Sequence, residues 1–259
     1  MSLNVFFRKF MRSIGFLTRI PVSNNWFEDK NNIADDVVFF PLVGFFIGLL
    51  SAVIFVIASF LGFPPLMSAL FSVLAIIFTT GALHEDGLAD LADALFVAKT
   101  KNDRLAIMKD SHIGTYGTIA LIFGVAIRFF SIAAIFESAD YKRVCIAIIM
   151  TETFSRGLMV WFWIKLPLAR INGTASKAGC PSKKNSFNSV TISLGIFLLL
   201  GACGFHLLWL FLLAILCFLF ISLFSLLCLK RIGGYTGDTL GAFQQCSALF
   251  ILCGLYLAL

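Results

Sequence analysis

Two long stretches without a charged side chain stand out along the chain, residues 37–83 and 190–229. A helix of about twenty predominantly apolar residues crosses a bilayer core, so each stretch is long enough for two helices. Pro64 and Pro65 interrupt the first stretch, and Gly201 interrupts the second. Each stretch is therefore expected to form two membrane spans joined by a short turn.

Three further apolar segments qualify as single spans, which brings the predicted total to about seven. The predicted spans cover residues 38–61, 65–82, 114–136, 144–164, two helices within 190–229, and 240–258. Composition supports this class, because 59% of the residues are apolar and only 13% are charged, against about 25% charged in soluble domains. With a mean hydropathy of +0.95, the chain is predicted to be an all-α polytopic membrane protein and a single domain over 1–259. A soluble protein and a nucleic-acid-binding module are excluded.

The basic residues predict the orientation, because cytoplasmic loops of membrane proteins carry an excess of Lys and Arg. With seven spans, sixteen Lys and Arg fall in the alternate segments that begin with the N-terminus, and two fall in the others. We therefore expect a membrane protein with its N-terminus on the cytoplasmic side and its C-terminus on the other side. Residues 1–36, 83–113 and 230–239 would then lie on the cytoplasmic side.

The N-terminal segment is predicted to be an interfacial amphipathic helix ended by Pro21. Apolar residues recur at helical spacing with basic residues between them, which is typical of a helix lying at a membrane surface. Arg8, Lys9, Arg12 and Arg19 interrupt the apolar residues, so this is not a cleavable signal peptide.

Acidic residues are concentrated in one segment, since six of the fourteen lie in residues 83–113. In a helix, Asp86, Asp90 and Asp93 would share one face, where like charges repel. A divalent cation offsets such repulsion, and Mg²⁺ prefers carboxylate oxygens together with water and substrate phosphate. These three residues are therefore candidate metal ligands; the alternative is a solvated helix face.

Two further polar clusters precede predicted spans and are candidate binding loops. The first contains Asp110 and Gly114, at a helix N-terminus that would favour an anion, with a simple helix cap as the alternative. The second contains Gly234, Thr236, Gly237 and Asp238. Its aspartate could cap the last helix, but the glycines and threonines are more than a cap needs. It is not a Walker A loop, because no Gly-Lys-Thr or Gly-Lys-Ser follows.

Charged residues inside predicted spans are costly and need partners. Arg128 and Glu152 each lie twelve residues from Asp140, which centres the turn between two spans. They should therefore lie at the same depth, and we predict an ion pair between them. Arg156, one turn nearer the cytoplasm, would face the acidic cluster or a substrate phosphate. Arg170, in the next loop, is a candidate phosphate ligand.

Together these motifs resemble the cobalamin synthase family, the adenosylcobinamide-GDP ribazoletransferases. The matching segments follow the family's order and are residues 17–22, 40–44, 84–93, 108–117, 169–173 and 233–242. Residues 174–230 match only in hydropathy. Ala94 stands where glycine is usual, and His112 stands where arginine is common, so substrate affinity would depend on pH if that arginine binds phosphate.

The resemblance implies a Mg²⁺-dependent late step of coenzyme B12 assembly. Adenosylcobinamide-GDP and α-ribazole, or its 5′-phosphate, would give adenosylcobalamin, or its 5′-phosphate, and GMP. Such transfer rests on positioning and charge neutralisation. The proposed metal ligands are Glu85, Asp86, Asp90 and Asp93, with one of them, such as Asp93, or His84 accepting the nucleophile's proton. The proposed substrate contacts are Asp110, Gly114, Arg156, Arg170, Gly234, Thr236, Gly237 and Asp238. Expected partners are these substrates and the lipid bilayer, with other enzymes of the pathway and a second copy of the chain left open.

Two other functions remain open from the residues alone. A CDP-alcohol phosphotransferase also places carboxylates beside membrane helices, but its pattern continues Asp-Gly with Ala-Arg, and here Ala89 is followed by Asp90. A transporter would carry acidic residues at mid-membrane, broken helices and often an inverted repeat. The acidic residues of this chain gather instead on one predicted side of the membrane.

Overall fold

The computed structural model describes residues 3–27, 32–171 and 173–259, and in these ranges the chain is helical, with one isolated β-bridge. The elements are α1 (Leu3–Leu17), η1 (Asn24–Trp26), η2 (Ile33–Phe39), α2 (Phe40–Phe60), α3 (Pro65–Thr80), α4 (Leu83–Val97), α5 (Lys101–Ile107), α6 (Thr115–Ser138), α7 (Tyr141–Lys165), α8 (Thr174–Ala178), α9 (Lys183–Gly201), α10 (Leu207–Arg231) and α11 (Gly237–Tyr256).

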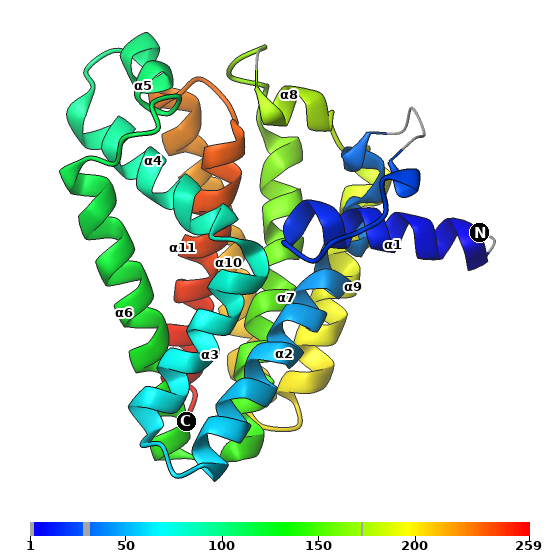
Figure 1. Cartoon of the computed structure of the whole chain (residues 1–259), viewed down its shortest axis with the longest axis vertical. Helices are drawn as coiled ribbons and strands as arrows, with labels where there is room; N and C mark the ends of the chain where they lie inside the picture. Colours follow the sequence, from blue (N-terminus) through cyan, green and yellow to red (C-terminus); the bar gives the residue numbers. More distant parts are fainter. Residues whose placement is uncertain (1–2, 28–31, 172) are drawn as a thin grey trace.

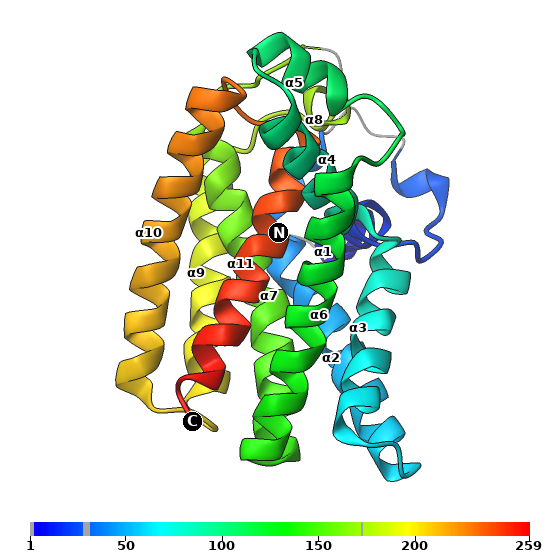
Figure 2. The same ribbon diagram turned by 90° about the vertical axis from the view of Figure 1, so that its left-hand side faces the viewer.

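The long helices run up and down the long axis of the molecule, with α7 in the middle of the bundle (Figures 1 and 2). The α2–α3, α6–α7 and α9–α10 turns and the C-terminus lie at one end. The α5 end, at the top of both views, carries α5, α8 and the α10–α11 loop. Segments far apart in the sequence therefore meet at the α5 end.

Within the described residues, five helical segments are long and apolar enough to cross a membrane: Ile33–Phe60, α6, α7, α10 and α11. α3 meets α4 at 90°, and this pair counts as a sixth span if it is taken as one. α9 is not among them because it opens with Lys183, Lys184 and Asn185. The prediction of an all-α polytopic membrane protein is confirmed. The count is five or six instead of seven, although a helix stands at each predicted span.

The 90° bend between α3 and α4 arises from two left-handed residues in succession. Gly81 has φ +65° and Ala82 has φ +57°, a region that residues with a Cβ rarely occupy. A Cβ at Gly81 would collide with the side chain of Arg19, whose backbone N–H donates to the Thr79 carbonyl at 2.7 Å. The bend turns the acidic helix α4 away from the direction of α3.

The predicted N-terminal helix is present as α1, which ends at Leu17, four residues before Pro21, and lies across the side of the bundle (Figure 1). Its buried Arg12 pairs with the buried Asp36 at 2.6 Å. Its other face exposes Phe6 and Phe7. An amphipathic helix with one polar anchor and exposed aromatic residues suits a membrane interface.

α2 and α7 pack closely because glycines on α2 face the α7 backbone. A Cβ at Gly44 would collide with the carbonyl of Glu152, and one at Gly48 would lie 2.7 Å from the Ile149 Cα. Small residues allow helix backbones to approach in membrane proteins, where packing replaces the hydrophobic effect between helices.

The Gly48→Ala variant is expected to be less stable than the parent protein by about 1–3 kcal/mol, the usual cost of overpacking. Gly195→Ala is the matched control, since Gly195 also lies in a helix and a Cβ there meets nothing within 4 Å. The midpoint of thermal unfolding in detergent should fall for the first variant and stay level or rise for the second. Equal shifts would contradict close packing of α2 on α7.

Candidate active site

A pocket of about 580 Å³ lies at the α5 end between α4, the α5–α6 loop and the start of α11. We call it the polar pocket. Its charged and imidazole side chains are Glu85, Asp86, Asp90, Lys109, Asp110, His112, Arg170 and Asp238. The acidic segment and the two predicted binding loops therefore meet here, as the sequence motifs required.

Glycines at a helix crossing bring the carboxylates of this pocket together. A Cβ at Gly87 on α4 would lie 2.6 Å from the Asp238 carbonyl, and one at Gly241 on α11 would lie 3.2 Å from the His84 Cα. The close crossing places the α4 carboxylates beside Asp238. Arg170 from the α7–α8 loop donates to the carboxylate of Asp238 at 3.3 Å, which adds a cation to the same wall.

Asp90 is half-buried on α4, outside the five spanning segments. Burial and the negative charges of Asp238, Asp86 and Asp93 raise the pKa of Asp90 to about 7, while the positive charge of Arg170 opposes this. Like charges that raise a carboxyl pKa in this way favour a bound cation, which would relieve the repulsion. In the described part of the chain, however, no three His, Cys, Asp or Glu side chains are grouped closely enough to hold one metal ion.

Asp93, predicted as a metal ligand and catalytic base, instead anchors the start of α6. Its two carboxylate oxygens accept the backbone N–H groups of Gly114 at 2.7 Å and Gly117 at 2.9 Å. A Cβ on either glycine would collide with this carboxylate. Gly114 was expected to approach a ligand, but its close neighbour is Asp93, which satisfies N–H groups that a helix start leaves unpaired.

Glu85, also predicted as a metal ligand, borders the polar pocket but is engaged on its inner side. Its carboxylate accepts from the Gln245 amide at 3.0 Å and lies 3.8 Å from the Arg128 guanidinium. The Glu85 side chain is only 8% exposed. Glu85 is therefore part of the bundle interior, whereas its neighbour Asp86 is exposed toward the pocket.

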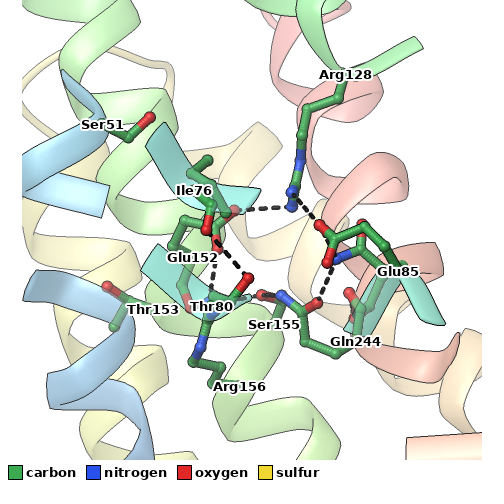
Figure 3. Close-up of polar contacts among 12 residues, drawn as sticks. Ser51, Ile76, Thr80, Glu85, Arg128, Glu152, Thr153, Ser155, Arg156 and Gln244 are labelled. Atoms are coloured by element: carbon green, nitrogen blue, oxygen red, sulfur yellow. Dashed lines mark hydrogen bonds and ion pairs between the residues drawn. The ribbon is translucent and has the colours of Figure 1, made fainter. Parts of the chain in front are cut away.

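The predicted ion pair between Arg128 and Glu152 is confirmed, at 2.8 Å. Arg156 reaches the second oxygen of the same carboxylate at 2.6 Å, so two arginines approach Glu152 from different sides (Figure 3). The three side chains are at most 2% exposed. The prediction that Arg156 contacts a substrate phosphate does not fit this geometry, because the pairing holds it inside the bundle.

The sequence analysis missed the polar side chains that extend this buried network along α11. The Gln244 amide donates to the Ser155 hydroxyl at 3.0 Å, and the Gln245 amide donates to the Gln244 side-chain oxygen at 3.1 Å. Both glutamines are buried. Two adjacent glutamines within an otherwise apolar span were the available signal, because such residues in membrane helices almost always have partners.

The loop at 233–241 is shaped mainly by its own packing. Thr236, not Asp238, caps α11: its hydroxyl accepts from the Thr239 N–H at 3.2 Å and Thr239 reciprocates at 2.8 Å. Gly234 has φ +153°, and a Cβ there would collide with the Pro167 carbonyl. Of the four residues predicted to bind substrate here, Gly234 and Thr236 are buried, and Gly237 and Asp238 border cavities.

Two other predicted residues lie in different surroundings. His84 is 3% exposed and borders a smaller cavity instead of the polar pocket. Asp110 is exposed at the rim of the polar pocket, where its carboxylate accepts the His112 backbone N–H at 3.1 Å and pairs with the imidazole at 2.6 Å. The hydrogen bond and charge of Asp110 raise the pKa of His112.

A family model for cobalamin-5-phosphate synthase matches residues 9–256 of the chain. The chain belongs to this family. Two curated proteins named adenosylcobinamide-GDP ribazoletransferase, from Brucella ovis and Brucella melitensis, are each 40% identical to it over 254 residues. Each alignment covers 96% of this chain and 96% of the relative. No solved structure matches the chain.

Asp93 and Asp90 of α4 have different surroundings, so their substitution should affect the stability of the protein differently. Asp93→Asn removes a charge-assisted acceptor and should destabilise the protein by about 1.5–3 kcal/mol. Asp90→Asn removes one of several like charges and should leave the midpoint of thermal unfolding unchanged or raise it. A similar loss of stability in both variants would refute the division of α4 into an anchoring carboxylate and a pocket carboxylate.

Proposed function

We propose that this protein is a Mg²⁺-dependent adenosylcobinamide-GDP ribazoletransferase that joins adenosylcobinamide-GDP to α-ribazole, or to its 5′-phosphate, and releases GMP. The observation that carries the proposal is the meeting of Asp86, Asp90 and Asp238 with Arg170 around one pocket, in a chain of the cobalamin-5-phosphate synthase family. The same family membership speaks against the CDP-alcohol enzyme and the transporter.

In the reaction, the bond between the phosphorus attached to cobinamide and the oxygen of GMP breaks. The same phosphorus forms a new bond to the oxygen of a ribose hydroxyl. Arg170 is placed to bind a phosphate with its forked donors, and Lys109 adds a second positive charge at the pocket. Asp86 and Asp90 line the pocket and are able to accept the proton of the hydroxyl, whereas Asp93 is not among the residues that line it and holds the start of α6. These residues therefore position the reactants and take up the proton.

The donor set suits Mg²⁺, because the pocket offers three aspartate carboxylates, and burial together with the neighbouring negative charges raises the pKa of Asp90. One or two of Asp86, Asp90 and Asp238 would bind the ion directly, in place of the predicted set that included Glu85 and Asp93, because no three such side chains of the described residues are grouped closely enough to share one ion. Mg²⁺ keeps several water or phosphate oxygens as ligands, so the three aspartates need not enclose it. When bound, it would neutralise charge on the phosphoryl group.

We place the α5 end on the cytoplasmic side of a bacterial inner membrane. The α5 segment and the α10–α11 loop, two of the basic segments predicted to be cytoplasmic, lie at this end, and loops rich in Lys and Arg stay inside. The polar substrates would then reach the pocket from the cytoplasm. α1, with exposed Phe6 and Phe7, would lie in the interface of the same leaflet.

Purified protein in lipid should release GMP only when adenosylcobinamide-GDP, α-ribazole and Mg²⁺ are all present, and EDTA should stop the release. Asp86→Asn, Asp90→Asn and Asp238→Asn should each lower kcat by about 10²-fold or more, as expected for groups that stabilise charge or move a proton. Asp103→Asn is the matched control, because Asp103 is an exposed aspartate at the same end.

An Asp90→Ala enzyme that still turned over would refute the site assignment. Equal rates with Mg²⁺ and with EDTA would refute the metal requirement. If well-folded protein released no GMP, the activity itself would be refuted and CDP-alcohol substrates would be tested next.

The affinity for adenosylcobinamide-GDP should fall as the pH rises. The pKa of His112 is raised and that of Asp110 is lowered, so Asp110 remains ionised throughout the neutral range. Protonated His112 balances this charge at low pH, and the pair becomes negative once pH exceeds the His112 pKa, which repels phosphate. The KM for adenosylcobinamide-GDP should therefore increase through that pKa, and His112→Arg should flatten the profile. An unchanged profile in the variant would contradict a role for His112.

A further inference from the structure

A second cavity, of about 280 Å³, adjoins the polar pocket. Asp86 and Asp238 line both cavities, so the two cavities adjoin at these residues. The smaller cavity is lined by residues of α1, α2, α4, α7, α8 and α11, with side chains that include Phe16, Phe40, Met159, Trp163, Ala175 and Ala178. We call it the apolar chamber.

The chamber and the polar pocket differ sharply in chemistry. Apart from Asp86 and Asp238 at the shared wall and the imidazole of His84, the described residues that line the chamber are uncharged and almost entirely apolar or glycine. Phe40 and Trp163 are no more than 1% exposed. A cavity lined by hydrophobic and aromatic side chains, with a few polar groups at one wall, is the usual form of a small-molecule site.

We infer that the apolar chamber binds the planar heteroaromatic base of the acceptor nucleoside, while the phosphate-bearing donor occupies the polar pocket. This inference rests on the proposed function and adds to it the place of each substrate. The base would lie among aromatic and aliphatic side chains, and its ribose would lie at the wall formed by Asp86 and Asp238. The ribose hydroxyl then stands between the two cavities, where it must meet the donor phosphate.

The proposed transfer takes place at the wall formed by Asp86 and Asp238. The hydroxyl oxygen forms a bond to the phosphorus attached to cobinamide, and the phosphorus–oxygen bond to GMP breaks. The hydroxyl proton passes to Asp86 or Asp90, and GMP leaves with the electron pair of the broken bond. The two reactants approach from two cavities, so neither has to pass the other.

The small volume of the chamber excludes the donor, and the positive charges of the polar pocket suit the donor's phosphates. At about 280 Å³, the chamber lies at the lower limit of small-molecule pockets, which span roughly 300–1,000 Å³. It suits a bicyclic base and is too small for a corrin ring with its nucleotide. The polar pocket is twice as large and carries Lys109 and Arg170, which suit the phosphates of the donor.

The inference is tested by a larger side chain on α8, which reduces the volume of the chamber. Ala178 lines the chamber and is 6% exposed. Ala178→Leu should therefore raise the KM for α-ribazole about tenfold or more, because added methylene groups in a binding pocket change affinity by about that much. The KM for adenosylcobinamide-GDP should change less than about threefold. A nucleoside with a smaller monocyclic base should lose less affinity. Ala106→Leu is the matched control, because Ala106 is exposed on α5 at the same end. Ala175→Leu repeats the test if the first variant does not fold.

Binding is measured separately from turnover. α-Ribazole alone, without donor or Mg²⁺, should change the tryptophan fluorescence of the protein in detergent, and Trp163→Phe should abolish the change. Ala178→Leu should shift the same titration to higher concentration. This readout does not depend on GMP release.

The outcomes are distinguishable. If GMP is released but Ala178→Leu raises both KM values equally, or α-ribazole leaves the fluorescence of Trp163 unaltered, the inference is wrong and the proposed function stands. If α-ribazole binds and Ala178→Leu weakens it while no GMP is released under any condition, the proposed function fails and the nucleoside site stands. Displacement of α-ribazole by a fatty acid that itself binds more tightly would make the chamber a lipid site and overturn the inference.

Discussion

The structure depends on the pairing of charges inside an apolar bundle. Arg128, Arg156, Glu152 and Glu85 are buried among the helices, and removal of one partner would leave an uncompensated charge. Their contacts join α4, α6 and α7, and the glutamine pair extends them to α11. Because these contacts join α4 to both α6 and α11, they hold α4 between the two helices.

The buried charge pairing explains how α4 carries both carboxylates that hold the bundle together and carboxylates that line the polar pocket. Glu85 and Asp86 are adjacent, so their side chains point about 100° apart around α4. Glu85 faces the buried arginine and glutamine, while Asp86 faces the pocket. Farther along α4, Asp93 meets the start of α6 and holds it by two backbone N–H groups. The pocket carboxylates thus lie between two fixed points of their own helix.

The arrangement also suits a reaction between a large polar molecule and a small, largely apolar one. The α5 end offers the polar pocket with its cations, and the bundle beside it supplies apolar volume that a small soluble loop would not. The carboxylates at the junction are held by the close crossing at Gly87 and Gly241. A membrane fold therefore provides apolar space next to a polar pocket.

The sequence by itself determined the class of fold, the positions of the long helices, the three segments that form the pocket and the pair between Arg128 and Glu152. These follow from local hydropathy and from spacing along a helix, which the chain order fixes. Only the tertiary structure decided that Asp93 and Glu85 serve the bundle, that Arg156 is enclosed beside Glu152, and that α3 and α4 form a bent pair. Residues on one helical face look equivalent in sequence, but each acquires its role from the neighbouring helix, and the packing that chooses that neighbour is set by contacts between distant segments.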